Sequence, residues 1–433
     1  MKSNHPKVMH QVAGRSLLGH VITAANEIDA LQHCIVCGPD MPQVESEAKA
    51  FAPNAVLATQ KNRLGTGHAV SMAESALGDF NGTILILYGD VPLIQPQTLK
   101  TLSALITSDM PLAILGFQTP TPKGYGRLLQ NELGNLTAIV EEKDATDEQR
   151  QIELCNSGIM AVDSKSLWPL LKQLDNNNAS KEYYLTDIVR HCVAQGKQVG
   201  IAVCGQDEVA GINDRRQLAD MEDVFQTKLR NAAMTQGVTM VAPQTVFLSA
   251  DTVFGMDITI EPNVFFGKGV KVGNNATIYA NCHIVETTIG EGALIGPFAR
   301  LRPGTDLGEN TKVGNFVEIK KATIEKGAKV NHLTYIGDAH IGEKANIGAG
   351  TITCNYDGFG KAKTNIGKGA FVGSNSSLIA PVSIGDGAYV GSASVVTKDV
   401  PDNALALSRA PQENKLDWAE RFRAAKLRNS KKG

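Results

Sequence analysis

The segment IGEGALIGPFARLRPGTDLGENTKVG, residues 289–314, repeats an aliphatic residue followed by glycine. The pairs recur at steps of six, twelve and six residues, as Ile289-Gly290, Ile295-Gly296, Leu307-Gly308 and Val313-Gly314. A small residue stands four positions after the aliphatic one, as at Ala293, Ala299 and Thr311. This hexad is typical of a parallel β-helix, in which each short strand sends one aliphatic side chain inward and then turns.

The same pattern extends on both sides of the segment, from about Phe266 to Val390. Glycine or asparagine often stands at the turns, where a positive φ costs these residues little. We therefore expect β-helical coils from about residue 245 to 400. The pattern lapses twice, at the five-residue step from Ile336 to Ile341 and at the polar, glycine-rich insertion Cys354–Thr364. Loops that leave a rigid solenoid are favoured places for function.

The first half of the chain has a different rhythm, in which strand-like and helix-like segments alternate up to about residue 212. The aliphatic run TILILY at Thr83–Tyr88 predicts a central parallel strand that is buried on both faces. Other strands are expected at Leu31–Cys37, Leu112–Phe117 and Ile159–Val162, and helices at Gly19–Ile28 and Ala69–Leu77. This order predicts an α/β, Rossmann-like domain with ligand loops after its strands. The charged, glycine-free residues 214–236 predict a linker helix.

The charge balance argues against a nucleic-acid-binding or membrane-surface protein as a whole, and no partner of either kind and no membrane insertion is expected. The 433 residues include 42 basic and 44 acidic ones, for a net charge of −2. Residues 412–433 are the exception, with seven Lys/Arg against three acids. This stretch is interpreted as a solvated helix and tail, and attraction for a phosphate-rich ligand is the alternative. The length suggests two or three domains.

The cysteines and the apolar segments indicate a cytoplasmic protein. Seven scattered cysteines do not form a secreted disulfide framework, and the pair Cys34 and Cys37 lies in a predicted strand with no second pair nearby. The N-terminus lacks the apolar segment of a signal peptide, and no run approaches the ~20 apolar residues of a membrane span.

Three short motifs of the first half have residues suited to nucleotide chemistry. Asp90 follows the predicted strand directly, where a carboxylate can hold Mg²⁺ beside substrate phosphates or simply stabilise a turn. LGTGHA at 64–69 places two glycines before a helix-like segment, so its backbone N–H groups can face an anion or a base edge. GYGR at 124–127 is another glycine-rich turn.

Taken together and in order, these motifs resemble those of sugar-nucleotide pyrophosphorylases. The matching segments are PKV at 6–8, Gln60, LGTGHA, YGDVP at 88–92, GYGR, VEEKDA at 140–145, NSG at 156–158 and GIN at 211–213. From Met1 to about Gln412 the chain resembles the bacterial bifunctional enzymes that synthesise UDP-N-acetylglucosamine. This sugar nucleotide is a precursor of peptidoglycan and lipopolysaccharide. Those enzymes join an N-acetylglucosamine-1-phosphate uridylyltransferase to a glucosamine-1-phosphate N-acetyltransferase.

The resemblance implies site residues in the first half. Asp90 and Asn213 would hold Mg²⁺, and Lys7 would contact the UTP phosphates. The other residues expected to bind UDP-N-acetylglucosamine are Gln60, Gly65, Thr66, Tyr88, Gly89, Gly126, Glu141 and Asn156. Attack of a sugar-phosphate oxygen on the α-phosphorus of UTP needs positioning and charge neutralisation rather than a covalent nucleophile.

The resemblance also implies an acetyltransferase site in the β-helix. His332 would be the general base, since imidazole titrates in the range needed to take a proton from an attacking amine. Glucosamine phosphate would contact Arg302, Lys320, Tyr335 and Asn346. Acetyl-CoA would contact Ala349, Asn355, Tyr356, Ser374, Ser392 and Arg409. Hexapeptide acyltransferases usually form threefold assemblies, so a homotrimer is expected.

We therefore predict an α/β nucleotidyltransferase domain followed by a left-handed parallel β-helix of hexapeptide repeats. The predicted ranges are 1–212 for the uridylyltransferase, 213–236 for the linker helix, 237–411 for the acetyltransferase and 412–433 for a basic helix or tail. Two alternatives stay open. The first is an acetyltransferase with an inactive nucleotide domain, and the second is a non-catalytic binding solenoid.

The start of the sequence gives one further expectation. Members of the family begin with a strand and a glycine-rich loop ending in G-T-R-M, and residues 1–7 align with the stretch that starts at the loop's methionine. We expect Met1 to be an internal methionine, so that this strand and the main phosphate-binding loop precede it. The printed chain should then have weak or no uridylyltransferase activity. An in-frame stop just upstream in the coding DNA would contradict this.

Overall fold

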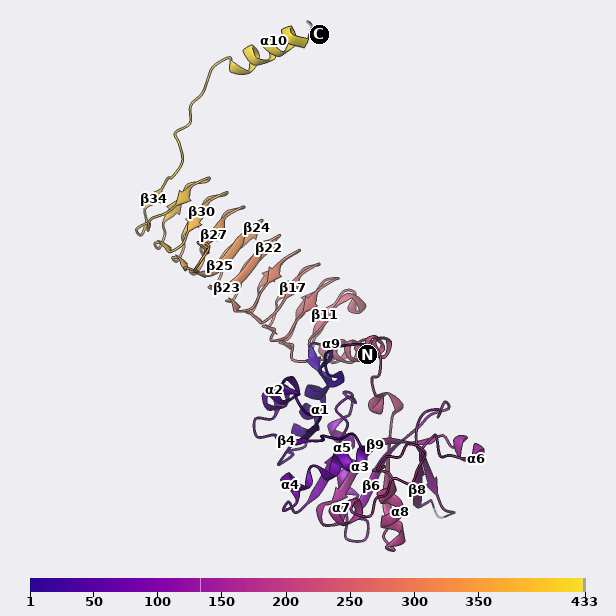
Figure 1. Cartoon of the computed structure of the whole chain (residues 1–433). Helices are drawn as coiled ribbons and strands as arrows, with labels where there is room; N and C mark the ends of the chain where they lie inside the picture. The colour runs from indigo at the N-terminus through magenta and orange to yellow at the C-terminus, as the bar shows by residue number, and fades with distance from the viewer. Residues whose placement is uncertain (133, 431–433) are drawn as a thin grey trace. The chain divides into compact units, whose positions relative to one another are not determined.

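The structure, a computed structural model, describes residues 1–132 and 134–430 (Figure 1). The chain divides into two compact units, Met1–Lys228 and Leu229–Gly433. Their boundary lies inside α9 (Arg215–Thr235), the helix that the sequence predicts over residues 214–236. None of the helices in the described part is long and apolar enough to cross a membrane.

The first unit has helices around three separately hydrogen-bonded sheets, of which the largest has six strands. Its helices are η1 (Lys7–Met9), α1 (Leu17–Asn26), α2 (Pro42–Phe51), α3 (Thr66–Ser71), α4 (Glu74–Leu77), α5 (Pro96–Ala104), α6 (Asp147–Arg150), α7 (Ser164–Leu171), α8 (Asp187–Ala194) and η2 (Gln206–Val209). Its strands are β1 (Gln11–Val12), β2 (Arg15–Ser16), β3 (Cys34–Cys37), β4 (Val56–Thr59), β5 (Thr83–Ile86), β6 (Leu112–Gln118), β7 (Arg127–Gln130), β8 (Leu136–Val140), β9 (Leu154–Asp163) and β10 (Val199–Cys204).

The predicted role of Thr83–Tyr88 as a central parallel strand is wrong. β5 pairs only with β9 among the described strands, and that pairing is antiparallel. Only Ile84 of its four residues is fully buried. The ten-residue strand β9 accounts for the difference, because it pairs antiparallel with both β5 and β6. The parallel pairs among the described strands of this unit are β6 with β10 and β3 with β4.

Most other predicted elements of the first unit are present with shifted ends. The helix expected at Ala69–Leu77 is two short helices, α3 and α4, because the α-helix is interrupted at Met72 and Ala73. The core lies around β6 and β9, where Leu112, Ile114 and Met160 are completely buried. The predicted ligand residues lie in loops that follow β4, β5 and β8 or precede β7 and α9, apart from Lys7 on η1, Thr66 on α3 and Asn156 on β9.

The second unit is the predicted parallel β-helix, and it runs from β11 to β34 (Figure 1). Its first face is a ten-stranded parallel sheet. The strands of this face are β11 (Val238–Met240), β13 (Ile258–Ile260), β16 (Thr277–Ile278), β19 (Leu294–Ile295), β22 (Lys312–Asn315), β24 (Lys329–His332), β26 (Asn346–Ile347), β29 (Phe371–Val372), β32 (Tyr389–Val390) and β34 (Leu405–Ala406).

The other two faces belong to one sheet of fourteen strands, because β23 and β25 each bend across the corner between the faces. The second face holds β14 (Phe265–Phe266), β17 (His283–Ile284), β20 (Arg300–Leu301), the starts of β23 (Glu318–Ile324) and β25 (Tyr335–Ile341), β27 (Ile352–Cys354), β30 (Ser377–Ile379) and β33 (Val395–Val396). The third holds β12 (Val253–Phe254), β15 (Lys271–Val272), β18 (Thr287–Ile289), β21 (Thr305–Leu307), the ends of β23 and β25, β28 (Thr364–Ile366) and β31 (Val382–Ile384). The remaining helices are η3 (Pro243–Thr245) and α10 (Trp418–Ser430).

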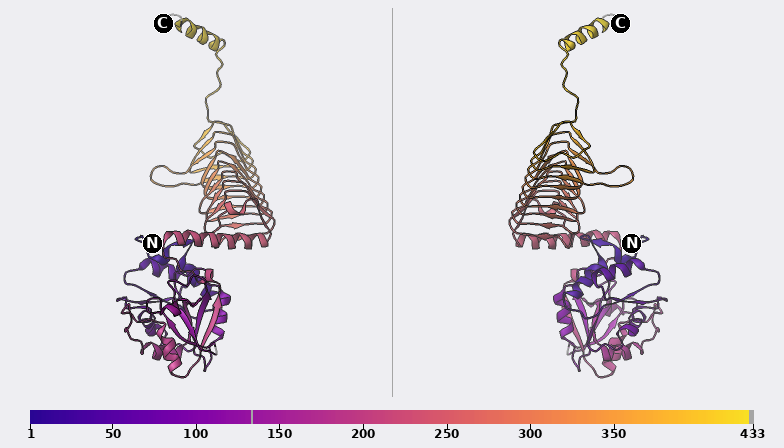
Figure 2. Two further views of the ribbon diagram at one scale, coloured as in Figure 1. Left: turned by 90° about the vertical axis from the view of Figure 1, so that its right-hand side faces the viewer. Right: turned by 90° about the vertical axis from the view of Figure 1, so that its left-hand side faces the viewer.

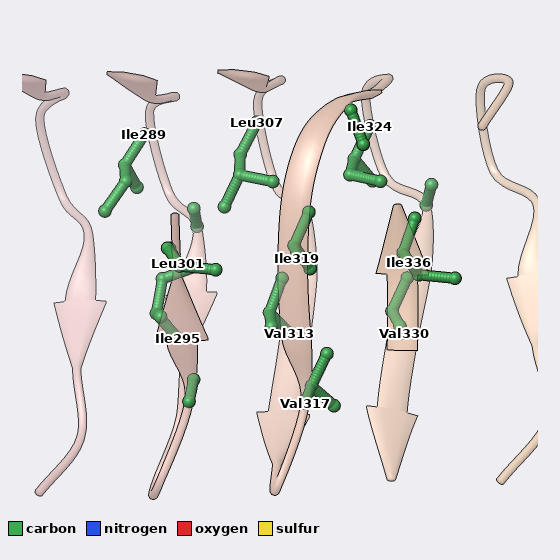
Figure 3. Close-up of a cluster of buried hydrophobic side chains, with 14 of the residues drawn as sticks. Ile289, Ile295, Leu301, Leu307, Val313, Val317, Ile319, Ile324, Val330 and Ile336 are labelled. Atoms are coloured by element: carbon green, nitrogen blue, oxygen red, sulfur yellow. The ribbon is translucent and has the colours of Figure 1, made fainter. Parts of the chain in front are cut away.

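The aliphatic residues of the hexads form one continuous core inside the coils. Figure 3 shows Ile295, Leu301 and Leu307 pointing into the same interior from successive strands, with Val313 and Ile319 in the next coil. These five side chains are at most 1% exposed. Burying each one contributes about 1.5–3 kcal/mol, so the stack of coils is stabilised along its whole length. Cys354–Thr364 leaves the coils as a projecting loop (Figure 2), as the lapse in the hexads predicts.

Candidate active sites

Three predicted ligands of the first unit meet at one point. Lys7 lies on η1, Asp90 follows β5 and Asn213 precedes α9. The Lys7 ammonium contacts Asp90 Oδ2 and donates to Asn213 Oδ1 at 2.6 Å. The backbone joins the latter two segments as well, because Ile212 N donates to Asp90 O at 3.3 Å. A carboxylate and an amide oxygen therefore already share one cation at the position predicted for Mg²⁺.

The residues predicted to bind N-acetylglucosamine also come together. Asn156 N donates to Gly126 O at 2.8 Å, and a Cβ on Gly126 would lie 3.4 Å from the Glu141 carboxylate. Burial raises the pKa of Glu141, and Thr186 Oγ1 donates to its Oε1 at 3.2 Å. The arrangement is a half-buried carboxylate beside a glycine that leaves room for a ligand.

Tyr88 closes this cluster on the side of Asp90. A Cβ at Gly158 would lie 2.6 Å from the Tyr88 ring, and Gly158 has φ of +87°, so glycine is required there. Burial raises the pKa of Tyr88 to about 12, with the Glu141 carboxylate as a second cause. Gly89 is crowded less tightly, since its Cβ would lie 3.2 Å from Val8.

The LGTGHA turn is more occupied than the sequence suggests. Gly67 N donates to Tyr183 O at 2.8 Å, and Leu185 N donates to Thr66 Oγ1 at 3.1 Å. Gly65, with φ of +113°, is held against Tyr183, and Gln60 Nε2 donates to Gly65 O at 3.1 Å. The prediction that this turn offers its N–H groups is therefore wrong for Gly67. The turn is instead linked through Leu185 to the neighbouring Thr186, which contacts Glu141.

The buried arginine of the GYGR motif supports the residues Gly126, Glu141 and Asn156, which we call the sugar cluster. Arg127 is 1% exposed, and its Nη2 donates to Glu142 Oε2 at 2.8 Å and to Arg150 O at 3.1 Å. Its Nη1 contacts Tyr125 O. The hydrogen bond from Arg127 is the main cause that lowers the pKa of Glu142. Arg127 and Glu142 are the chain neighbours of Gly126 and Glu141, so this pair fixes both backbones.

In the second unit, one corner carries the predicted base and three predicted acetyl-CoA contacts. On five successive coils the turn from the first face to the second contains a residue with positive φ, at positions 316, 333, 350, 375 and 393. We call the residues directly before these positions the corner column, namely Asn315, His332, Ala349, Ser374 and Ser392. Backbone hydrogen bonds connect the coils here, from Leu333 N to Asn315 O at 3.1 Å and from Gly350 N to His332 O at 3.1 Å.

His332 is held by three hydrogen bonds. Its Nδ1 lies 2.9 Å from Asn315 Oδ1, and its carbonyl accepts from Gly350 N and from Thr334 Oγ1, the latter at 2.6 Å. The ring is exposed in the single chain. The side after His332 in the corner column is open, because Ala349 carries only a methyl group.

The predicted phosphate ligands lie at the far end of the second face, where the chain turns toward the third face. Arg302 N donates to Ile319 O at 2.9 Å, so Arg302 and Lys320 occupy the same place on neighbouring coils. Arg302 Nη1 also pairs with Glu318 at 2.6 Å. The structure adds Lys361 of the projecting loop, which is the largest cause that lowers the pKa of Lys320, ahead of Arg302. The basic residues of the insertion are the sequence feature that could have predicted this third cation.

Five further predicted residues have distinct positions. Tyr335 begins β25, and a Cβ at Gly337 would lie 2.4 Å from its hydroxyl and 2.8 Å from Asn355 Nδ2. Asn355 and the 61% exposed Tyr356 form the base of the projecting loop, next to Tyr335 rather than in the corner column. Asn346 lies on β26, on the face that carries His332. Arg409 lies in the exposed segment after β34.

Fold and sites together define a two-unit transferase, with a nucleotidyltransferase unit followed by a hexapeptide acyltransferase unit. Residues 1–179 match the model of the MobA-like NTP transferase domain, and residues 286–321 and 363–398 match that of the bacterial transferase hexapeptide (six repeats). The predicted fold class, including the left-handed β-helix, is confirmed.

Comparison with curated proteins identifies the family. The chain is 53% identical over 429 residues to the bifunctional protein GlmU of Rhodopseudomonas palustris (strain BisA53), covering 99% of this chain and 94% of the relative. It is 49% identical over 428 residues to that of Zymomonas mobilis subsp. mobilis (98% and 95%) and 50% over 431 residues to that of Bradyrhizobium sp. (strain ORS 278) (100% and 96%). The chain belongs to the bifunctional GlmU family. It is an enzyme of UDP-N-acetylglucosamine synthesis with both transferase functions, as the resemblance predicts.

Proposed function

We propose that His332 is the general base in the acetylation of glucosamine-1-phosphate. The amine nitrogen attacks the thioester carbonyl of acetyl-CoA, its proton passes to His332, and the CoA thiolate leaves. The corner column is the observation that carries this assignment. Ala349, Ser374 and Ser392 lie one, two and three coils beyond His332, and their small side chains suit an extended thioester that lies along the coils. Arg409 and the loop residues Asn355 and Tyr356 then contact the remainder of acetyl-CoA.

The sugar phosphate is assigned to the basic residues at the turn from the second face to the third. Arg302 and Lys320 lie on neighbouring coils, and Lys361 of the projecting loop adds a third positive charge beside Lys320. Three converging cations suit a phosphate dianion, because each gains a charge-assisted hydrogen bond. Tyr335 on the second face and Asn346 on the first lie on either side of the corner column, where they contact the sugar ring.

Acetyl transfer by the purified chain tests these roles. Release of free CoA is followed with glucosamine-1-phosphate as acceptor, for the wild type, His332→Ala and His340→Ala. His340 is a matched control, because it is also an exposed histidine of the β-helix but belongs to the third face. We expect His332→Ala to lose on the order of 10²–10⁴-fold in kcat and His340→Ala to keep it. Equal activity of all three proteins would refute the proposed base.

In the first unit we propose that Asp90 and Asn213 hold Mg²⁺. Their two oxygens already surround the Lys7 ammonium, and such hard oxygen donors suit this cation. When bound, Mg²⁺ would neutralise charge on the UTP phosphates, and Lys7 would then be free to pair with a phosphate. The described residues contain no group of three or more His, Cys, Asp or Glu that could hold a metal ion.

The sugar cluster positions the nucleophile for this second reaction. Gly126, Glu141 and Asn156 bind N-acetylglucosamine-1-phosphate, and Tyr88 and Gly89 connect them to Asp90. Gln60, Gly65 and Thr66 bind the uracil nucleotide. A phosphate oxygen of the sugar attacks the α-phosphorus of UTP, and diphosphate leaves in line.

Diphosphate release from UTP and N-acetylglucosamine-1-phosphate tests this assignment, with acetyl transfer as the internal control. Asp90→Asn should abolish diphosphate release while acetyl transfer stays unchanged. If the wild-type chain acetylates but releases no diphosphate, the protein is an acetyltransferase with an inactive nucleotide unit. If it does neither, the non-catalytic solenoid is the better description.

A homotrimer is the proposed assembly, and an exposed apolar row supports it. Phe298, Phe316 and Leu333 follow one another on the corner, are 48%, 55% and 64% exposed, and all have positive φ. Large apolar residues rarely adopt this conformation, and such a row in water favours contact with another subunit. Phe316→Asn keeps a residue suited to positive φ and removes the apolar surface. Light scattering should then show a smaller particle than the wild type, and an unchanged mass would contradict the proposed contact.

We also propose a cytoplasmic location. The seven cysteines are all free thiols, including Cys34 and Cys37, and free thiols persist in reducing compartments. Alkylation of the intact protein isolated from cells should modify thiols without prior reduction.

A further inference from the structure

We infer that Asn315 is a positioning residue that sets the tautomer of the His332 ring. This inference rests on the proposed role of His332 and goes further, because it names the group that prepares the base. Asn315 ends β22 and His332 ends β24, and the two are direct partners in the register of these strands. Their side chains meet across the gap between coils, with 2.9 Å between Asn315 Oδ1 and His332 Nδ1.

The chemistry of the contact decides where the proton lies. An amide oxygen only accepts hydrogen bonds, so His332 Nδ1 carries the hydrogen and donates it to Asn315 Oδ1. The neutral ring then has its lone pair on Nε2, the atom that must receive the proton of the attacking amine. Which ring nitrogen is protonated is set by the hydrogen bond that the other makes.

The surroundings of the ring match this role better than a chance surface contact. The His332 backbone is fixed by two hydrogen bonds to its carbonyl, so the ring has a defined origin. Within the corner column a hydrogen-bond acceptor lies on one side of His332, and the methyl group of Ala349 lies on the other. The ring is therefore held on the side away from the proposed position of acetyl-CoA.

A neutral partner has a consequence that a carboxylate would not have. An amide oxygen orients the ring without adding a negative charge, whereas a carboxylate at the same place would stabilise the imidazolium. A base that is protonated too readily is unavailable at neutral pH. Asn315 thus orients the ring without placing a negative charge beside it.

The experiment compares Asn315→Asp, Asn315→Leu and His332→Ala in the full chain. Acetyl transfer is measured from pH 5.5 to 9, with the thermal unfolding of each variant as a control for folding. Asn315→Leu should lower kcat by about 10–100-fold, part of what a positioned base contributes, with KM for acetyl-CoA unchanged. Asn315→Asp is nearly isosteric, should retain activity at high pH, and should move the acid limb of the kcat/KM profile upward by about one pH unit.

A spectroscopic measurement makes the test independent of activity. In ¹⁵N-histidine-labelled protein the His332 signals are identified by their loss in His332→Ala. They should show hydrogen on Nδ1 in the wild type and a mixed tautomer in Asn315→Leu. Wild-type kcat in Asn315→Leu, or an unmoved acid limb in Asn315→Asp, would overturn the inference. If His332→Ala itself stays active, the proposed function fails, which is a separate result.

Discussion

Gly314→Ala should break the β-helix at the coil that presents the active corner. Gly314 lies on β22, one residue before Asn315, and its φ is not in the left-handed region. The problem is space, because an added Cβ would lie 1.9 Å from Asn331 O on the next coil. Real Cβ atoms come no closer than about 3.0 Å to such an atom, so the coils must separate locally by about 1.1 Å.

The cost follows from what holds these coils together. Such a shift would carry the hydrogen bond of 3.1 Å from Leu333 N to Asn315 O beyond bonding distance, together with its neighbours in the ladder. Each lost backbone bond costs about 0.5–1.5 kcal/mol, and buried groups left without a partner cost about 1–3 kcal/mol. We expect a loss of about 3 kcal/mol, or ~6–12 °C in the transition of a unit this size.

Calorimetry and acetyl transfer measure the effect, with Gly360→Ala as the matched control. Gly360 lies in the projecting loop, has an ordinary φ and has open space where its Cβ would lie. Both changes alter the unfolded chain equally, so their difference isolates the clash. Diphosphate release by the first unit should be unchanged in both variants. If the two variants unfold at the same temperature, the argument from coil spacing is wrong.

Three further outcomes are expected, all concerning the first unit. Arg127→Met should lower the midpoint of urea unfolding, followed by the fluorescence of Trp168, which is buried in this unit. Arg150→Met, which removes an exposed ion pair, should leave this midpoint unchanged. Equal midpoints of the two variants would contradict the role of the buried guanidinium. Since the pKa of Glu142 is lowered in the folded protein, its pairing stabilises above the ordinary value of 4.5 and is lost as pH falls through the lower folded value. The midpoint difference between wild type and Arg127→Met should therefore shrink in acid, and a constant difference down to pH 3 would exclude this pair as its source. EDTA should stop diphosphate release and spare acetyl transfer, and excess Mg²⁺ should restore the former in the wild type but not in Asp90→Asn; diphosphate release that survives EDTA would refute the metal.

The repeat in the second unit made its fold predictable, because each hexad indicates both which residue is buried and where the chain turns. The first unit has no such redundancy. The aliphatic run at β5 correctly indicates a strand, but its partner β9 is over sixty residues away and its direction is not encoded in local hydrophobicity. Sequence reasoning therefore assigned a central parallel position to a strand that pairs on one side.

The same limit applies to the sites. Lys7, Asp90 and Asn213 were named from matching motifs, and the structure brings them into contact although they lie far apart in sequence. Lys361 and Asn315 were missed for a common reason. Each gains its neighbour from loop geometry or coil register, which the local sequence does not encode, although the lysines of the insertion were a signal for Lys361.

The corner column also measures length. Coils of parallel strands repeat every ~4.8 Å, so Ser392, three coils beyond His332, lies roughly 14 Å from it. The β-helix thus acts as a molecular ruler, whose graduations are set by backbone hydrogen bonds rather than by side-chain contacts. Removing one complete coil between His332 and Ser392 would keep the remaining coils in register but shorten the distance between these two residues by one coil. A donor as long as the natural thioester would then overrun its final contact, whereas a truncated pantetheine thioester would fit as before.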